Sequence, residues 1–208
     1  MTNSPSSLTR IQDDARFQNA RLIGRGAAGD VYVATDIALS RLVAIKHYRD
    51  FDGHSSQHLG SILKLVASLR HPGIAQVVDV IRTQTSLQLV QTYCANGPLS
   101  VSLRESETDV ESIAEVFMKI CDAVSYMHNR GIVHCDLKLA NILRSDNGDP
   151  VLIDFDHCRE LGSAESVSFV GTPAYMAPEL IQQRAPASVA TEVFALELFY
   201  MNCFQGNW

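Results

Sequence analysis

The chain has 208 residues, of which 46% are hydrophobic and 19% are charged, and its formal net charge is −6. That length allows one large domain or two small lobes with a buried core. The negative balance disfavours a general nucleic-acid-binding protein, and the longest apolar runs fall far short of the roughly 20 residues of a membrane span. The polar first residues also lack the apolar segment of a signal peptide. We therefore expect a soluble, cytoplasmic protein with no nucleic-acid or membrane partner.

The five cysteines form an odd set without any C-x-x-C pair. This spacing argues against a disulfide framework and against a zinc site. We expect ordinary thiols, most of them buried, at Cys94, Cys121, Cys135, Cys158 and Cys203.

The first half of the chain predicts a small antiparallel β-sheet with one helix. Residues 1–16 are polar, and we expect a disordered tail there. Apolar residues recur at spacings of three and four over 55–69, which is typical of an amphipathic helix, and a Pro-Gly pair then ends it. We predict a β-rich lobe over 17–95. Its strands are expected in segments rich in Val, Ile and Tyr, at 20–36, 41–48, 75–82 and 86–93.

The second half is dominated by helical patterns. Residues 110–129 place apolar side chains, from Val110 to Met127, on one face of a long helix. Asn147-Gly148 signals a tight turn, so the segments that flank it, 141–144 and 151–154, predict a hairpin. A polar loop is expected up to Thr172, and a last helix over 192–204. The predicted fold class is α+β, with a helical lobe over 96–208.

Glycines open the β-rich half in the pattern G-x-G-x-x-G, at Gly24, Gly26 and Gly29. Such glycines let backbone N–H groups approach phosphates closely. A dinucleotide-binding fold needs a helix after the glycines, whereas here a strand pattern follows, and Lys46 lies in the next strand. The motif therefore favours a strand-loop-strand cover over nucleotide phosphates. A glycine-rich hairpin without a ligand remains the alternative.

Five motifs in order, GRGAAG, VAIK, HCDLKLANIL, DFD and GTPAYMAPE, together resemble the eukaryotic-type protein kinase family. The resemblance covers about residues 20–205, and DLKLAN and GTPAYMAPE are similar to the serine/threonine branch. It implies a two-lobed protein-kinase-like fold and an ATP-dependent protein serine/threonine kinase active in signal transduction. ATP and Mg²⁺ would be its cofactors and a protein its substrate.

Phosphoryl transfer depends on in-line positioning and on neutralising charge. The resemblance implies that Asp136 accepts the proton of the substrate hydroxyl and that Lys138 lies near the transferred phosphate. Lys46 would contact the ATP phosphates, and the oxygens of Asn141 and Asp154 would bind Mg²⁺, a hard cation. In an arbitrary sequence Asp136 would be read as a turn residue and Asn141 as a cap. The motifs in register favour the catalytic interpretation.

The resemblance also implies a nucleotide site lined by residues from both halves of the chain, with Gln91 guarding a deeper pocket. His134 and Phe155 would pack beneath the site. The expected ATP-binding residues are Ile23, Gly24, Gly26, Gly29, Val31, Ala44, Lys46, Tyr93, Cys94 and Leu143.

Three positions near the site depart from the family pattern. Ile62 stands where a helix glutamate normally pairs with the strand lysine, and no Asp or Glu occurs between Gly53 and Val78. Asp156 replaces the glycine of D-F-G. Cys135 replaces an arginine that many members use to bind a phosphorylated activation loop, so we expect little regulation of that kind.

The last helical segment departs as well. Glu192 stands where an aspartate is usual, Glu197 stands where a glycine is usual, and the chain ends before the helices that normally follow. We interpret the chain as a C-terminally truncated catalytic domain whose helical lobe ends early. We expect four apolar side chains to be partly uncovered, and we expect this apolar patch to promote association. They are those of Phe194, Leu198, Phe199 and Trp208.

Two alternatives to an active kinase remain at this point. One is a nucleotide-binding pseudokinase that serves as a scaffold, and the other is an inactive truncated fragment. Lys46, Asp136, Asn141 and Asp154 favour catalysis, whereas Ile62, Asp156 and the early end of the helical lobe favour the alternatives.

Overall fold

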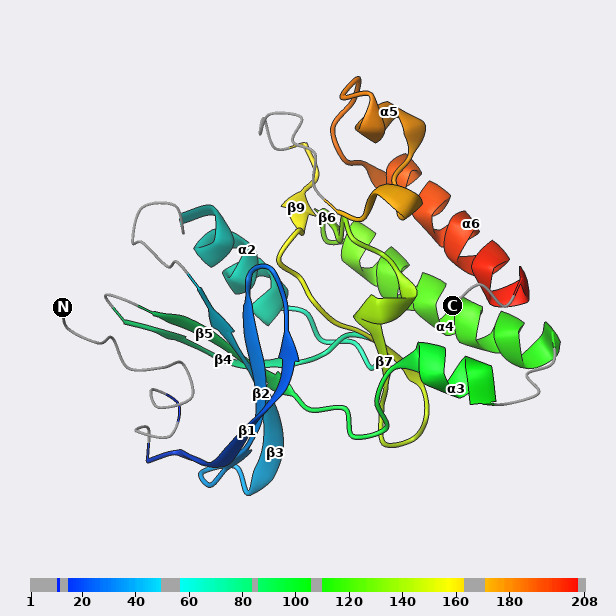
Figure 1. The fold of residues 1–208 in the computed structure, drawn as a ribbon. Coiled ribbons are helices and arrows are strands. Elements are labelled where there is room, and N and C mark those ends of the chain that lie inside the picture. Colours follow the sequence, from blue (N-terminus) through cyan, green and yellow to red (C-terminus); the bar gives the residue numbers. More distant parts are fainter. Residues whose placement is uncertain are drawn as a thin grey trace. The chain divides into compact units, whose positions relative to one another are not determined.

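The computed structural model describes residues 11, 15–49, 57–83, 86–105, 110–162 and 171–205. The chain divides into two compact units (Figure 1). The first consists of Met1–Leu69 and Gln76–Tyr93, and the second of Arg70–Ala75 and Cys94–Trp208. Most of the expected N-terminal tail, 1–16, lies outside the described residues. Among the helices in these ranges, none combines the length and apolar character that crossing a bilayer requires.

The first unit contains a five-stranded antiparallel sheet in the order β1-β2-β3-β5-β4 (Figure 1). The predicted antiparallel β-sheet is thus confirmed, and the glycine pattern runs from the end of the first strand through the turn to the start of the second. The strands are β1 Phe17–Arg25, β2 Gly29–Asp36, β3 Arg41–Tyr48, β4 Val77–Arg82 and β5 Leu87–Thr92.

The two faces of this sheet carry different side chains, because successive residues of a strand point to opposite faces. One face forms an apolar core that Ile11 and Phe17 help to seal. The other face carries Val31, Ala44 and Lys46, since Val31 pairs with Lys46 in the strand register. The sheet residues of the core face are Tyr32, Ala34, Val43, Ile45 and Val90.

Helix α2, Gln57–Ala67, packs against β4. The spacing of three and four predicted its buried face correctly, because Ile62, Leu63 and Val66 are each no more than 4% exposed. The expected helix, 55–69, was two residues longer at each end. Residues 55 and 56 lie outside the described residues, and Ser68 lies in a turn after the helix.

Arg16 joins three parts of the first unit. Its guanidinium binds the fully buried carboxylate of Asp36 at 2.8 Å and also bonds Asp79. Asp36 additionally accepts the backbone N–H groups of Ala38 and Leu39. The hydrogen bond from Arg16, with those backbone bonds, outweighs burial and lowers the pKa of Asp36.

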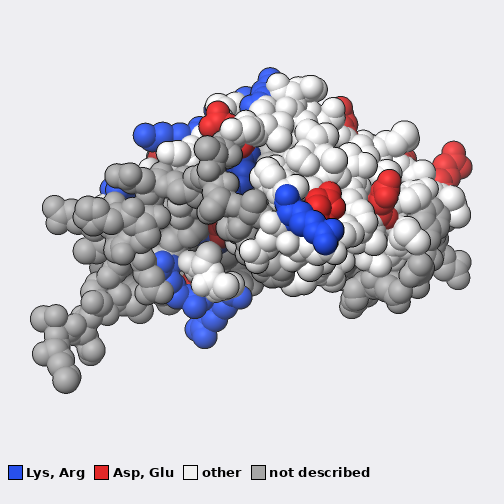
Figure 2. Space-filling view, turned by 90° about the horizontal axis from the view of Figure 1, so that it is seen from above, with Lys and Arg blue, Asp and Glu red and all other residues white. Residues whose placement is uncertain are grey.

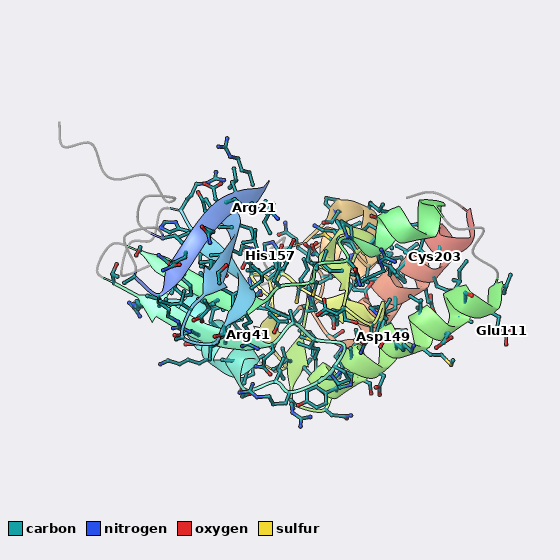
Figure 3. All side chains as sticks on the ribbon, turned by 90° about the horizontal axis from the view of Figure 1, so that it is seen from below. Arg21, Arg41, Glu111, Asp149, His157 and Cys203 are labelled. Carbon is teal, nitrogen blue, oxygen red and sulfur yellow. The ribbon has the colours of Figure 1, made fainter. Side chains whose placement is uncertain are left out.

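Replacing Arg16 by Met is therefore expected to lower the free energy of unfolding by about 2 kcal/mol at pH 7, between the values for exposed and buried pairs. Because the folded-state pKa of Asp36 is depressed, this stabilisation is present above the unfolded-state pKa and is lost as the pH falls through the folded-state pKa. Urea unfolding at pH 7 and below pH 3 measures both effects. Arg21→Met, at an exposed position on β1 (Figure 3), is the control. An equal loss at both pH values would contradict the assignment.

The second unit is mainly helical. The predicted hairpin is confirmed, since β7 (Ile142–Arg144) pairs with β8 (Pro150–Leu152) and Gly148 in its turn has a φ of 86°. The helices are α3 Leu99–Glu105, α4 Val110–His128, α5 Pro178–Ile181 and α6 Val189–Gln205. The short strands are β6 Ile132–Val133, β7 Ile142–Arg144, β8 Pro150–Leu152 and β9 Arg159–Glu160, with 3-10 turns at Leu139–Asn141 and Pro173–Tyr175.

Two expectations about apolar helix faces were wrong. Val110, expected on the buried stripe of α4, is 64% exposed because it is the first residue of the helix. Phe199, expected to be uncovered, is only 2% exposed, and its ring lies 6.3 Å from that of Phe117 on α4. Phe194 and Leu198 are partly exposed, as expected, and the exposed large apolar side chains among the described residues of α6 are Val189, Val193 and Met201. Trp208 lies outside the described residues.

Residues 70–75 belong to the second unit, although we expected them in the β-rich lobe. The backbone N–H of Leu152 donates to the carbonyl of Gly73, and Ala75 donates back to Leu152, both at 2.9 Å. Arg70 donates its N–H to the hydroxyl of Tyr126 on α4. These bonds join distant segments, so the local pattern of the sequence did not reveal them.

Candidate active site

The loop between β6 and β7 is held in place by buried side chains. Fully buried His134 accepts the N–H of Asp136 through Nδ1 at 3.3 Å, and its Nε2 lies 3.1 Å from the carbonyl oxygen of Ile153. Its ring centroid is 5.6 Å from that of Phe155, also fully buried. Cys135, which lies between His134 and Asp136 in the chain, has a φ of 65°, which few non-glycine residues adopt. The turn that presents Asp136 is therefore fixed by packing and hydrogen bonds.

Asp136 is the centre of a hydrogen-bonded cluster. Its Oδ2 accepts from Nδ2 of Asn141 at 2.9 Å and lies 2.7 Å from Nζ of Lys138, while Oδ1 accepts from the hydroxyl of Thr172 at 2.7 Å. Burial acts to raise the pKa of Asp136, but the bonds from Lys138, Thr172 and Asn141 outweigh it and lower the pKa. The carboxylate is therefore ionised at neutral pH, so both of its oxygens accept hydrogen bonds and neither donates one.

Thr172 belongs to this cluster although the sequence did not single it out. Its hydroxyl accepts from Nζ of Lys138 at 2.7 Å and donates to Asp136. The preceding Gly171 has a φ of 112°, and a Cβ there would collide with the carbonyl oxygen of Cys135. Only glycine lets this segment lie so close to the loop. The signal that could have found Thr172 is its place in GTPAYMAPE.

Glu192 of α6 also binds the loop between β6 and β7. Its Oε1 accepts the backbone N–H of Cys135 at 2.6 Å, and its Oε2 lies 2.7 Å from Nε2 of His128 on α4. Glu192 is only 3% exposed. Sequence reasoning identified Glu192 as a departure from a family pattern and missed His128 altogether. A buried carboxylate with two partners fixes the backbone beside Asp136 to two helices.

Asn141 and Asp154 lie on neighbouring segments at one end of the β7–β8 hairpin. The backbone N–H of Ile153 donates to the carbonyl of Asn141 at 3.0 Å, and Asp154 is the next residue. The side-chain amide nitrogen of Asn141 donates hydrogen bonds to Asp136, so the amide oxygen is the atom that can bind a metal ion. A neutral oxygen beside a carboxylate is the donor set that Mg²⁺ prefers. These residues therefore fit a magnesium site.

The glycine turn of the first unit is tightly closed. The N–H of Gly26 donates to the carbonyl of Gly29 at 2.9 Å. Arg49 holds the turn from the end of β3, since its guanidinium bonds the carbonyl of Gly26 at 2.8 Å and Asp30 at 2.7 Å. A Cβ on Gly29 would collide with the carbonyl of His47, so that position requires glycine. The turn at this end of the sheet is thus held by backbone and side-chain hydrogen bonds.

The profile of a family described as "Protein kinase domain" matches residues 17–207. The chain belongs to the protein kinase family. A serine/threonine-protein kinase, PknD, from Chlamydia trachomatis is 34% identical over 223 residues, which cover 88% of this chain and 24% of that protein. CBL-interacting serine/threonine-protein kinase 12 from Arabidopsis thaliana is 28% identical, over 86% of this chain and 38% of that protein. Cytokinesis protein sepH from Emericella nidulans is 31% identical, over 96% of this chain and 15% of that protein.

These similarities confirm the eukaryotic-type serine/threonine branch and the α+β kinase fold predicted from the motifs. The chain spans about a quarter of the length of the first curated relatives that it matches.

The predicted kinase residues are divided between the two units. In the first unit, Val31, Ala44 and Lys46 share one sheet face beside the glycine turn. Gln91 lies opposite Ala44 in the register of β3 and β5, and its buried Oε1 has no hydrogen-bond partner among the described residues. Ile23 is 42% exposed on β1. The predicted residues in the second unit are Cys94, Asp136, Lys138, Asn141, Leu143 and Asp154.

The cysteine that replaces the arginine of many kinases is a packed thiol. Burial, with the nearby charge of Glu192, raises the pKa of Cys135 to about 12. Its Sγ contacts the carbonyl of Val133 at 3.8 Å. Cys135 is therefore neutral at physiological pH, which fits a packing role and not that of a nucleophile.

Charges on the described surface are mixed. The face in Figure 2 shows basic and acidic side chains interspersed with uncharged surface. On that face, the described residues of the kinase form no continuous surface of one sign.

Proposed function

We propose that the chain is an active serine/threonine protein kinase that transfers the γ-phosphate of ATP to protein hydroxyl groups. The cluster of Asp136, Lys138, Asn141 and Thr172 carries this proposal. An ionised carboxylate has about four acceptor sites, and three are used by the bonds to Oδ1 and Oδ2. The remaining site on Oδ1 suits a substrate hydroxyl, and the ammonium of Lys138 beside it suits a phosphate that is being transferred.

The same proposal assigns the other residues of the site. Mg²⁺ would neutralise charge on the phosphate oxygens, with Asn141 and Asp154 as its ligands. The N–H groups of the glycine turn and the ammonium of Lys46 would bind the phosphates. The nucleoside would contact Ile23, Val31, Ala44, Tyr93, Cys94 and Leu143. The protein that receives the phosphate is a further part of the proposal, which rests on the family alone.

A nucleotide-binding scaffold is the second candidate, and Ile62 favours it. Ile62 is 4% exposed in α2, so this helix offers an apolar side chain where most kinases offer a carboxylate to the strand lysine. Asp156 adds a negative charge two residues after Asp154. Both features act against efficient transfer without removing the nucleotide-binding residues.

Transfer of labelled γ-phosphate from Mg·ATP to a generic serine/threonine substrate tests the proposal. Purified 1–208 is expected to label the substrate, and chelation of Mg²⁺ is expected to abolish labelling. Lys46→Met is expected to lower the rate about 10²-fold, as for removal of one preorganised charge contact. Stabilisation of the chain by Mg·ATP against thermal unfolding is measured in parallel. A folded chain that binds Mg·ATP and transfers nothing would establish the scaffold instead.

A further inference from the structure

The strand lysine lies against an aromatic ring of its own strand. Lys46 and Tyr48 are two residues apart on β3, so their side chains share one face of the sheet. Nζ of Lys46 lies over the Tyr48 ring, 5.5 Å from its centroid. An ammonium within about 6 Å of a ring face is attracted by the negative charge of that face. Tyr48 is only 4% exposed, which limits the water that would weaken this attraction.

The position of Tyr48 gives the attraction a direction. Tyr48 pairs with Gly29 in the register of β2 and β3, whereas Lys46 pairs with Val31. A lysine side chain that leans from position 46 toward position 48 therefore leans toward the last glycine of the turn. The proposed function places the phosphates at this turn. The ring thus draws the ammonium toward the expected phosphates.

Helix α2 does not supply this orientation. Ile62 is buried, and the sequence holds no carboxylate from residue 54 to residue 77. We propose that Tyr48 is a positioning residue that orients Lys46 toward the glycine turn, as the helix carboxylate does in other kinases. The inference rests on the proposed nucleotide-binding role of Lys46.

A ring differs from a carboxylate in one chemical respect. A carboxylate neutralises the ammonium that it holds, whereas an aromatic ring has no net charge and does not itself neutralise the ammonium. The ring is also held by burial, so orienting Lys46 does not require ordering a second flexible charged side chain.

The test changes the charge on the ring face while keeping the shape of the side chain. Tyr48 is replaced by phenylalanine and by phenylalanines with one, two and three ring fluorines, which progressively weaken the negative face. The kcat/KM for Mg·ATP is expected to stay within about twofold for phenylalanine and to fall stepwise by about tenfold across the series. A packing role would give a flat series, and that result would overturn the proposal.

Tyr32 provides the matched control. It lies on β2, is also 4% exposed, and points to the opposite face of the sheet. The same fluorinated series at position 32 is expected to leave kcat/KM unchanged. An equal gradient at both positions would mean that fluorination acts through the sheet as a whole, which contradicts a specific role for Tyr48.

A second readout separates this inference from the proposed kinase activity. In chains with carbon-13-labelled lysine, the ring current of Tyr48 is expected to shift the ε-methylene resonance of Lys46, and Tyr48→Leu is expected to remove the shift. If the resonance is shifted but no phosphate is transferred, the contact between Lys46 and Tyr48 is supported and the proposed kinase activity is not. An unshifted Lys46 resonance in the folded wild-type chain would overturn the inference, whatever the activity.

Discussion

Asp136→Asn is expected to lower phosphate transfer by about 10²- to 10⁴-fold, the range for loss of a general base. Asparagine has the same shape, but its amide takes no proton and its nitrogen would face the donors Lys138 or Thr172. Because the carboxylate of Asp136 holds three hydrogen-bond partners, some loss of stability is expected as well. Initial rates with labelled Mg·ATP measure the first effect, and thermal unfolding measures the second.

Asp146→Asn is the control for this prediction. Asp146 is an exposed carboxylate in the same unit, in the turn between β7 and β8. The same change of charge there is expected to leave the transfer rate unaltered. If Asp136→Asn kept more than a tenth of the wild-type rate, Asp136 would not be the base.

Glu192→Ala is expected to have the second largest effect. It would leave the buried N–H of Cys135 and the ring of His128 without the carboxylate that binds both. Leaving a buried donor without its acceptor costs about 1–3 kcal/mol of stability for each donor. Displacing a catalytic group by about 1 Å can cost on the order of 10²-fold in rate. Urea unfolding and phosphate transfer measure the two effects.

Glu192→Asp keeps the negative charge and shortens the side chain, so it separates the effect of side-chain length from that of charge. Aspartate is the usual residue of the family at this position, yet here the carboxylate must contact both Cys135 at 2.6 Å and His128 at 2.7 Å. A side chain shorter by one methylene is expected to lose one of these bonds, at a cost of about 1–3 kcal/mol. Glu197→Asp, at an exposed position of the same helix, is expected to change stability by no more than about 0.5 kcal/mol. A Glu192→Asp variant as stable and active as the wild type would refute this account.

Much of the fold could be predicted because its determinants are local. The β7–β8 hairpin follows from the turn at Gly148, and α2 follows from the spacing of Ile62, Leu63 and Val66. The order of the kinase motifs identified the family before any coordinate was known. Turn preference and side-chain periodicity act over a few residues, so one sequence is enough to reveal them.

The partners of the catalytic loop required the tertiary structure. Thr172 is 36 residues from Asp136, and Glu192 is 57 residues from Cys135. No periodic pattern links residues so far apart. Several buried carboxylates and hydroxyls compete as partners in any sequence, and the path of the chain decides which ones meet.

The sequence by itself determined the local elements, the order of the motifs, and the absence of a carboxylate from the segment that forms α2. Only the tertiary structure decided that Phe199 is buried, that residues 70–75 join the second unit, and that Lys46 lies over Tyr48. The physical reason is the range of the forces. Backbone preferences act between neighbours in the chain, whereas burial and hydrogen bonding act between whichever groups the folded chain brings together.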